Sequence, residues 1–291
     1  MDTSTPQVRS TAHVSLPVHT LEGAGFPVRR PFPIPEQPLL DPFLMVDQVG
    51  PIDLAPGEAK GAPPHPHRGF ETIAYVLDGD IEYADSQGHR GVVPPGAVQW
   101  LTAGSGIVHS AMPTREFLAR GGRQHNLQIW VNLPAALKSL PPRTRTRSAE
   151  EIPAVRTADG SELKVIAGRT HGVSGPFDTH VPVLVVHARL AAGGRAEFPA
   201  PAGHNAAVYV LAGEAALPDA HLPDGRLAVL AGDGERIVVT APRGPAEVLV
   251  LTGEPIGESV ARSGPFVMNT TDELLQAQRD HALGLMGDLT P

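Results

Sequence analysis

The chain has 291 residues, of which 41% are hydrophobic, with 31 glycines, 31 prolines, no cysteine and a formal net charge of −8. This length suits one large core or two smaller ones, and so much glycine and proline predicts short strands and turns instead of long helices. The lack of cysteine excludes disulfides, iron–sulfur clusters, zinc ribbons and thiol catalysis. The negative charge argues against a nucleic-acid partner bound through its phosphates.

Residues 1–20 lack the charged-then-apolar pattern of a signal peptide. No apolar run approaches the roughly 20 residues that a membrane-spanning helix needs. We therefore expect a cytoplasmic protein with no membrane partner.

In chain order, the proline-rich first forty residues are predicted to be irregular, and a short buried strand follows at 41–47. Turn signals such as Asp78-Gly79 and Pro94-Pro95-Gly96 then separate apolar or alternating segments. The predicted strands are 70–77, 81–83, 92–93, 97–101 and 127–131. Strands this short, at a spacing of about 8–12 residues, are typical of a β-sandwich or barrel.

Residues 134–148 are predicted to be a linker, because this segment is polar and interrupted by prolines. Its three arginines, at 143, 145 and 147, are expected to be solvated.

An internal repeat indicates two copies of one β-fold. Residues 69–79 align without gaps on 203–213, and Tyr-Val-Leu-x-Gly is identical in both. We expect domains at 1–138 and 148–291. At the same offset of 134, His65, His67 and His109 fall on Pro199, Pro201 and Arg243, so we expect metal in the first copy alone.

Near the C-terminus, Thr270 and Glu273 form a predicted capping box, and good helix formers follow up to Gly284. This pattern predicts one helix of about three turns that packs on a barrel.

The strongest chemical signal is His65-Pro66-His67, with a third histidine, His109, after the glycine-rich turn 104–106. On a strand, His65 and His67 lie on the same face, because side chains alternate. Neutral imidazoles suit iron, nickel, copper or zinc, and a site with three protein ligands keeps positions open for chemistry.

The sequence resembles the pirin family of bicupins. The matching segments are Leu40–Leu44, His65–Thr72, Gln99–His109, Gln128–Pro134 and Gly264–Thr270. The resemblance implies an all-β fold of two cupin (double-stranded β-helix) barrels in tandem, which the predicted C-terminal helix completes. It also implies an iron-type site in the N-terminal barrel and, for some members, oxygen-dependent cleavage of a flavonol such as quercetin. We expect Fe(II), with Ni, Cu, Mn or Zn as alternatives.

The chain departs from the family at the site itself. The family pattern after the third histidine is His-x-Glu, with the glutamate as fourth ligand, whereas here Ala111 has no donor atom. Water or substrate can take that place, Glu71 can serve as fourth ligand or support the ligands, or the site binds metal weakly.

The leading hypothesis is a metal-dependent dioxygenase that acts on a small aromatic or enolic substrate with O2. The alternative, which Ala111 supports, is a non-enzymatic metal-binding or regulatory bicupin that docks on a protein partner.

Overall fold

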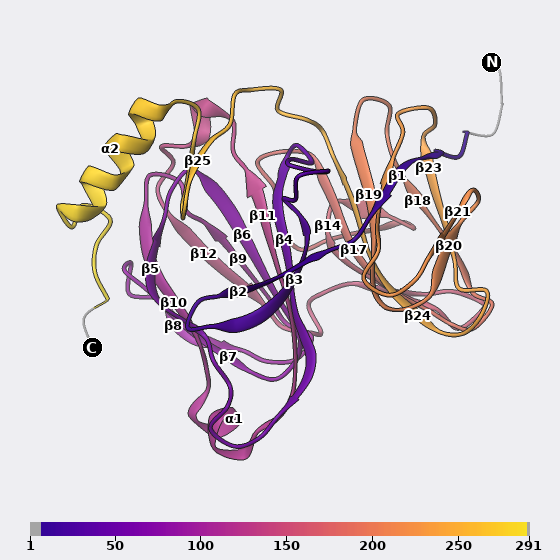
Figure 1. Ribbon diagram of the computed structural model, residues 1–291, viewed down its shortest axis with the longest axis horizontal. Helices are drawn as coiled ribbons and strands as arrows, with labels where there is room; N and C mark the ends of the chain where they lie inside the picture. Colours follow the sequence, from indigo (N-terminus) through magenta and orange to yellow (C-terminus); the bar gives the residue numbers. More distant parts are fainter. Residues whose placement is uncertain (1–6, 290–291) are drawn as a thin grey trace. The chain divides into compact units, whose positions relative to one another are not determined.

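The computed structural model describes residues 7–289, in which the chain forms two compact β units with exchanged end segments (Figure 1). The N-terminal barrel consists of residues 43–150 together with 19–30 and the described part of 256–291. The C-terminal barrel consists of residues 151–255, residues 31–42 and the described part of 1–18. The boundaries expected from the sequence, 1–138 and 148–291, do not include this exchange.

The N-terminal barrel is built from a seven-stranded sheet, in the order β12-β9-β6-β11-β4-β3-β2, and a four-stranded sheet, in the order β5-β10-β7-β8. Neighbouring strands from β4 to β12 pair antiparallel. The strands are β2 Val18–Glu22, β3 Phe26–Phe32, β4 Phe43–Leu54, β5 Ala62–His67, β6 Phe70–Asp78, β7 Ile81–Asp85, β8 Arg90–Val93, β9 Val98–Thr102, β10 Ile107–Pro113, β11 Gly122–Asn132 and β12 Arg143–Arg147. Helix α1 (Arg115–Arg120) and a 3₁₀ turn (Ala135–Leu137) lie in the connections.

The C-terminal barrel repeats this plan, with one sheet in the order β1-β22-β19-β24-β17-β14-β13 and another in the order β18-β23-β20-β21. The strands are β1 Thr11–Ser15, β13 Ala154–Arg156, β14 Glu162–Ala167, β17 Val183–Leu190, β18 Arg195–Pro199, β19 Asn205–Gly213, β20 Ala215–Leu217, β21 Ala220–Leu222, β22 Leu227–Leu230, β23 Arg236–Thr240 and β24 Ala246–Gly253, with a small hairpin of β15 Arg169–Thr170 and β16 Val173–Ser174. Apolar side chains from both sheets, including Val186, Val208 and Ile237, form one buried core inside it. This interior is therefore packed.

The predicted C-terminal helix is confirmed as α2 (Thr271–Ala282), with Thr270 as N-cap and the capping box to Glu273 formed. Together with the hairpin β25 (Ala261–Ser263) and β26 (Phe266–Met268), it belongs to the N-terminal barrel. Its buried face packs in an apolar cluster with Val108 and Phe266. The C-terminal segment thus covers the barrel that holds the histidines.

The internal repeat is confirmed in part, because β6 and β19 occupy the same sheet position at the expected offset. Strand pairing corrects one alignment, however. His65 pairs with His109 in the first barrel, and Pro199, the counterpart of His65, pairs with Arg236 in the second. The counterpart of His109 is therefore Arg236 and not Arg243, because the loop lengths between the aligned strands differ.

Two other expectations were wrong. The first forty residues contain β1, β2 and β3, and β1 pairs with β22. The predicted linker contains β12, which pairs with β9 at the edge of the large sheet. In β1 and β12 apolar or β-branched residues alternate with polar ones, which is a strand pattern.

Among residues 7–289, no helix has the length and apolarity needed to cross a membrane.

Candidate metal centre

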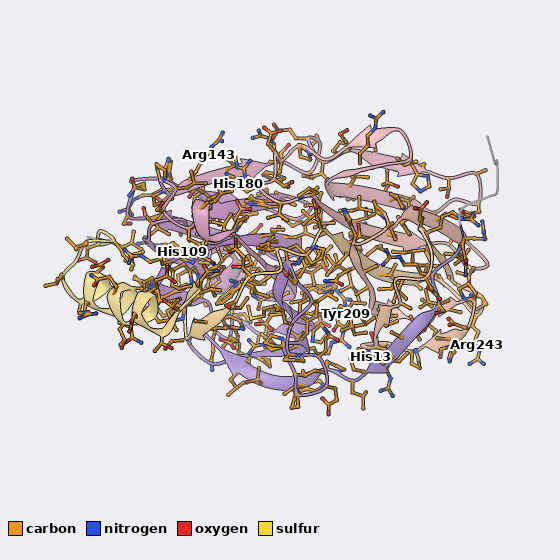
Figure 2. The ribbon with its side chains drawn as sticks, turned by 90° about the horizontal axis from the view of Figure 1, so that it is seen from above. His13, His109, Arg143, His180, Tyr209 and Arg243 are labelled. Atoms are coloured by element: carbon orange, nitrogen blue, oxygen red, sulfur yellow. The ribbon has the colours of Figure 1, made fainter. Side chains whose placement is uncertain are left out.

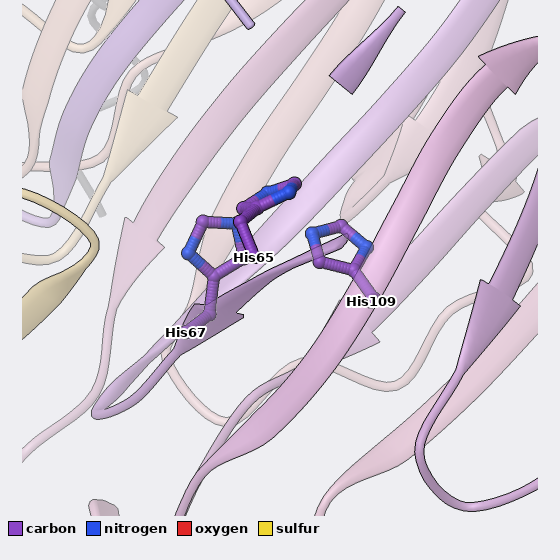
Figure 3. Close-up of side chains that lie close together, drawn as sticks. All are labelled: His65, His67 and His109. Carbon is purple, nitrogen blue, oxygen red and sulfur yellow. The ribbon is translucent and has the colours of Figure 1, made fainter. Parts of the chain in front are cut away.

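Two neighbouring strands bring the three predicted histidines together. His65 on β5 pairs directly with His109 on β10, and His67 lies two residues further along β5 on the same face. The ligand atoms of the three rings all lie within 4.8 Å of one another (Figure 3). The two strands therefore form one cluster from residues more than forty positions apart.

The spacing of His65 and His67 fits binding to a single ion. The Nε2 atoms of His65 and His67 are 3.1 Å apart. Two nitrogens that each lie about 2.0–2.1 Å from one metal are separated by roughly 2.8–3.4 Å at bond angles of about 90–110°. Nε2 of His109 is buried without a hydrogen-bond partner in the described structure, as a nitrogen reserved for a metal would be.

Backbone carbonyls orient two of the rings. Nδ1 of His65 lies 2.7 Å from the oxygen of Pro63, and Nδ1 of His67 lies 3.4 Å from that of Pro265. A carbonyl oxygen can only accept, so Nδ1 carries the proton and donates, which leaves the Nε2 lone pair for a metal. Pro265 belongs to the C-terminal segment, which therefore helps to position a predicted ligand.

Burial keeps the imidazoles neutral. It lowers the pKa of His65, and it lowers the pKa of His67 and of His109 well below the usual value, with repulsion among the rings adding to the effect at His67 and His109. At neutral pH the three rings are thus uncharged and able to coordinate.

The position expected for a fourth ligand has no donor. Ala111 follows His109 by two residues on β10, and both line a small cavity of about 70 Å³ whose wall includes the amides of Gln99, Asn126 and Gln128. This geometry places the methyl group of Ala111 on the same side as the ring of His109.

Glu71 lies on the opposing sheet, outside the three-histidine cluster. Its carboxylate is buried, accepts a hydrogen bond of 2.6 Å from Oγ1 of Thr102 and lies 4.0 Å from the guanidinium of Arg145. Arg68, three residues before Glu71, bonds to Asp280 and to the carbonyl of Ser105.

A pocket of about 490 Å³ opens beside the cluster and is lined by His65 and His67. The ring of Trp130 packs edge-on against His67 at 5.2 Å between centroids. Other wall residues are Phe26, Met45, Arg30 and Arg262. Trp100, in contrast, is fully buried. His125 is also buried, with its Nε2 at 2.8 Å from the amide of Gln48.

The sequence analysis did not identify Lys138, whose hydrogen bonds connect three segments near the site. This buried ammonium group donates to the carbonyls of Gly69 and Val267 and to the side chain of Asn132, at 2.6–3.0 Å. It thereby links the turn after His67 to β26. A single lysine in a presumed linker carried no signal of this role.

The fold and site define a bicupin, in which one barrel carries a three-histidine centre and the other is packed. Two family profiles match the chain: Pirin over residues 25–131, and Pirin C-terminal cupin domain over residues 185–287. The chain belongs to the pirin family.

Several relatives align along most of the chain. A Pseudomonas aeruginosa protein named "Putative quercetin 2,3-dioxygenase" is 41% identical over 265 residues, which cover 90% of this chain and 92% of that protein. Mouse pirin is 38% identical over 265 residues, or 89% of this chain and 87% of its own length.

Solved structures of similar proteins share this fold. The crystal structure of a quercetin 2,3-dioxygenase from Acinetobacter baumannii has a TM-score of 0.92 at 34% identity, and the match covers 98% of this chain and all of that protein's chain. An Escherichia coli pirin in complex with nickel(II) shares the fold, with a TM-score of 0.63 at 21% identity over 84% of this chain and all of its own.

Proposed function

We propose that this protein is a metal-dependent dioxygenase that acts on an enol-bearing aromatic compound such as a flavonol. The observation that carries the proposal is the cluster of three neutral imidazoles beside a pocket of about 490 Å³ with an aromatic wall. A pocket of this volume falls in the range of small-molecule sites. Two similar proteins bear quercetin 2,3-dioxygenase names, which supports the choice of substrate class.

His65, His67 and His109 would hold one metal ion, with Fe(II) as the first choice and Ni, Cu, Mn or Zn as alternatives. When bound, such an ion supplies Lewis acidity and, for the redox-active metals, electron transfer with oxygen. The protein's own part is to hold the rings neutral and oriented through Pro63 and Pro265 and to accept a planar ligand against Trp130.

The missing carboxylate shapes the chemistry of the proposed site. Three neutral imidazoles leave the full charge of a divalent ion uncompensated, so an anionic ligand is favoured. Ala111 also offers no base to remove a proton from the substrate. The rate should therefore rise with pH through the pKa of the substrate itself. Glu71 as a fourth ligand is the weaker alternative, since its carboxylate bonds to Thr102.

The test is turnover by anaerobically reconstituted protein. Iron, nickel, copper and manganese forms are mixed with quercetin and then with oxygen, and we expect at least one to bleach the flavonol and consume oxygen. His109→Ala should abolish both signals, whereas Arg243→Ala, an exposed change on the C-terminal barrel, should not (Figure 2). If no metal form turns over quercetin or a panel of enolic and catecholic compounds, the enzyme proposal is wrong.

Ala111 supports a second candidate, a non-enzymatic bicupin that senses a metal or small molecule and docks on a protein partner. It differs from the first in one result: quercetin or a related ligand should perturb the spectrum of the bound metal without oxygen uptake.

A further inference from the structure

Arg262 stands out among the pocket residues that the metal centre does not use. It lies on β25, and its side chain lines the same pocket as His65 and His67. Its guanidinium carbon lies 4.7 Å from the centre of the Trp130 ring, and its Nη2 lies 3.6 Å from the sulfur of Met45. An aromatic face and a thioether fix the plane of the guanidinium but satisfy few of its five N–H donors.

The nearby carboxylates are bonded to another arginine. Both oxygens of Asp47 accept hydrogen bonds of 2.7 Å from Arg30, which also bonds to Glu22. No carboxylate among residues 7–289 forms an ion pair with Arg262, although Asp47 and Glu22 attract it at longer range. Arg262 is therefore the cation of this pocket that has no direct anionic partner in the described structure.

The net charge of the pocket wall is compatible with binding an anion. Two arginines, Arg30 and Arg262, balance two carboxylates, Asp47 and Glu22, so the four side chains sum to zero. A divalent ion on the three imidazoles would make the pocket positive, with Arg262 as a second positive centre at its wall.

We propose that Arg262 is a specificity-determining residue that binds a carboxylate of the substrate. The preferred substrate would then be a planar aromatic acid, with an enolic or phenolic oxygen for the metal and a separate carboxylate for Arg262. This inference rests on the proposed function, because it places the substrate in this pocket.

A carboxylate fits this place better than other groups. Its two oxygens match the planar fork of a guanidinium, and such bonds are about twice as strong as neutral ones. A phosphate would bring a second negative charge toward Asp47 and Glu22, which already line the pocket. If an uncharged flavonol were bound, the N–H donors of Arg262 would bond to water and not to the substrate.

The test compares two ligands that differ only in charge. Zinc-loaded protein is titrated calorimetrically with 3,4-dihydroxybenzoate and with 3,4-dihydroxybenzamide, which both offer a catechol to the metal. We expect the acid to bind about tenfold more tightly or better, as one charge-assisted hydrogen bond would give. In Arg262→Gln the ratio of the dissociation constant of the amide to that of the acid should fall to near one. Arg262→Lys should retain part of the preference for the acid. Arg243→Gln, an exposed arginine, is the matched control.

A metal-free arm separates this inference from the proposed function. Metal-free protein is titrated with 2-naphthoate and 2-naphthamide, which lack chelating oxygens, and the acid should again be preferred in an Arg262-dependent way. If no metal binds but this preference is present, the dioxygenase proposal fails and the role of Arg262 stands. A ratio near one in the unaltered protein, or one that survives Arg262→Gln, would overturn the inference.

Discussion

The side chains of His109 and Ala111 lie on the same side of strand β10. The residue that follows the third histidine on the ligand side is therefore an alanine, which has no donor atom. The sequence identified this difference, and the structure adds that amides, not carboxylates, border the place beside it. A bound ion would therefore keep more of its charge for substrate than it would with a glutamate present.

Restoring the carboxylate should tighten metal binding. In Ala111→Glu an anionic oxygen would replace water on a divalent ion, and we expect the dissociation constant of the metal to fall by about tenfold or more, measured by competition with a chelator. Ser110→Glu is the control, because the adjacent residue points to the other side of the strand. If Glu71 is already the fourth ligand, Ala111→Glu should change little and Glu71→Gln should weaken binding, which would contradict our assignment.

Among the elements, the turn between β5 and β6 connects the ligands to the C-terminal segment. Gly69 has a φ of +88°, and a Cβ at this position would lie 2.0 Å from the carbonyl oxygen of Val267 on β26. Arg68 beside it bonds to Asp280 on α2. Only glycine allows the two segments to approach this closely.

Gly69→Ala should therefore both destabilise the fold and weaken metal binding, since the turn after His67 must move. Gly88→Ala is a matched control, because Gly88 has the same φ of +88° with open space where a Cβ would lie. We expect the control to lose about 1 kcal/mol from backbone strain alone and Gly69→Ala to lose several times more, measured by urea unfolding. Equal losses would show that the contact with β26 is unimportant.

Lys138, which bonds to both Gly69 and Val267, makes the stability of the fold depend on pH. Burial lowers its pKa from 10.5 to about 8. Between these values the unfolded chain holds more protons than the folded one, so this group makes the fold more stable as pH rises. From pH 7.5 to 9.5 the free energy of unfolding of the unaltered protein should rise by about 2 kcal/mol relative to Lys138→Met, as two chemical denaturation curves would show. A constant difference between the two proteins would mean that Lys138 does not titrate in this range.

For the whole molecule, the sequence was enough to predict two β-barrels, the capped helix and the three-histidine cluster, because each leaves a local or repeated pattern. The exchange of end segments was not predictable, since β1 and α2 form contacts with strands that are distant in the sequence. The same holds for Lys138 and Arg262, whose partners come from separate elements. The counterpart of His109 was misplaced because a gap-free alignment ignores loop-length changes.

The second barrel should be a packed module without a metal. Its interior is filled by a continuous apolar core, and Pro199, Pro201 and Arg236 stand where the first barrel has its histidines. The metal content of the chain therefore reports on the N-terminal barrel alone.

Elemental analysis of protein purified without a histidine tag tests the central claim most directly. We expect close to one transition-metal ion per chain in the unaltered protein and in Arg243→Ala, and almost none in His67→Ala that retains its circular dichroism spectrum. Two ions per chain, or an undiminished ion in His67→Ala, would contradict a single three-histidine centre in the N-terminal barrel.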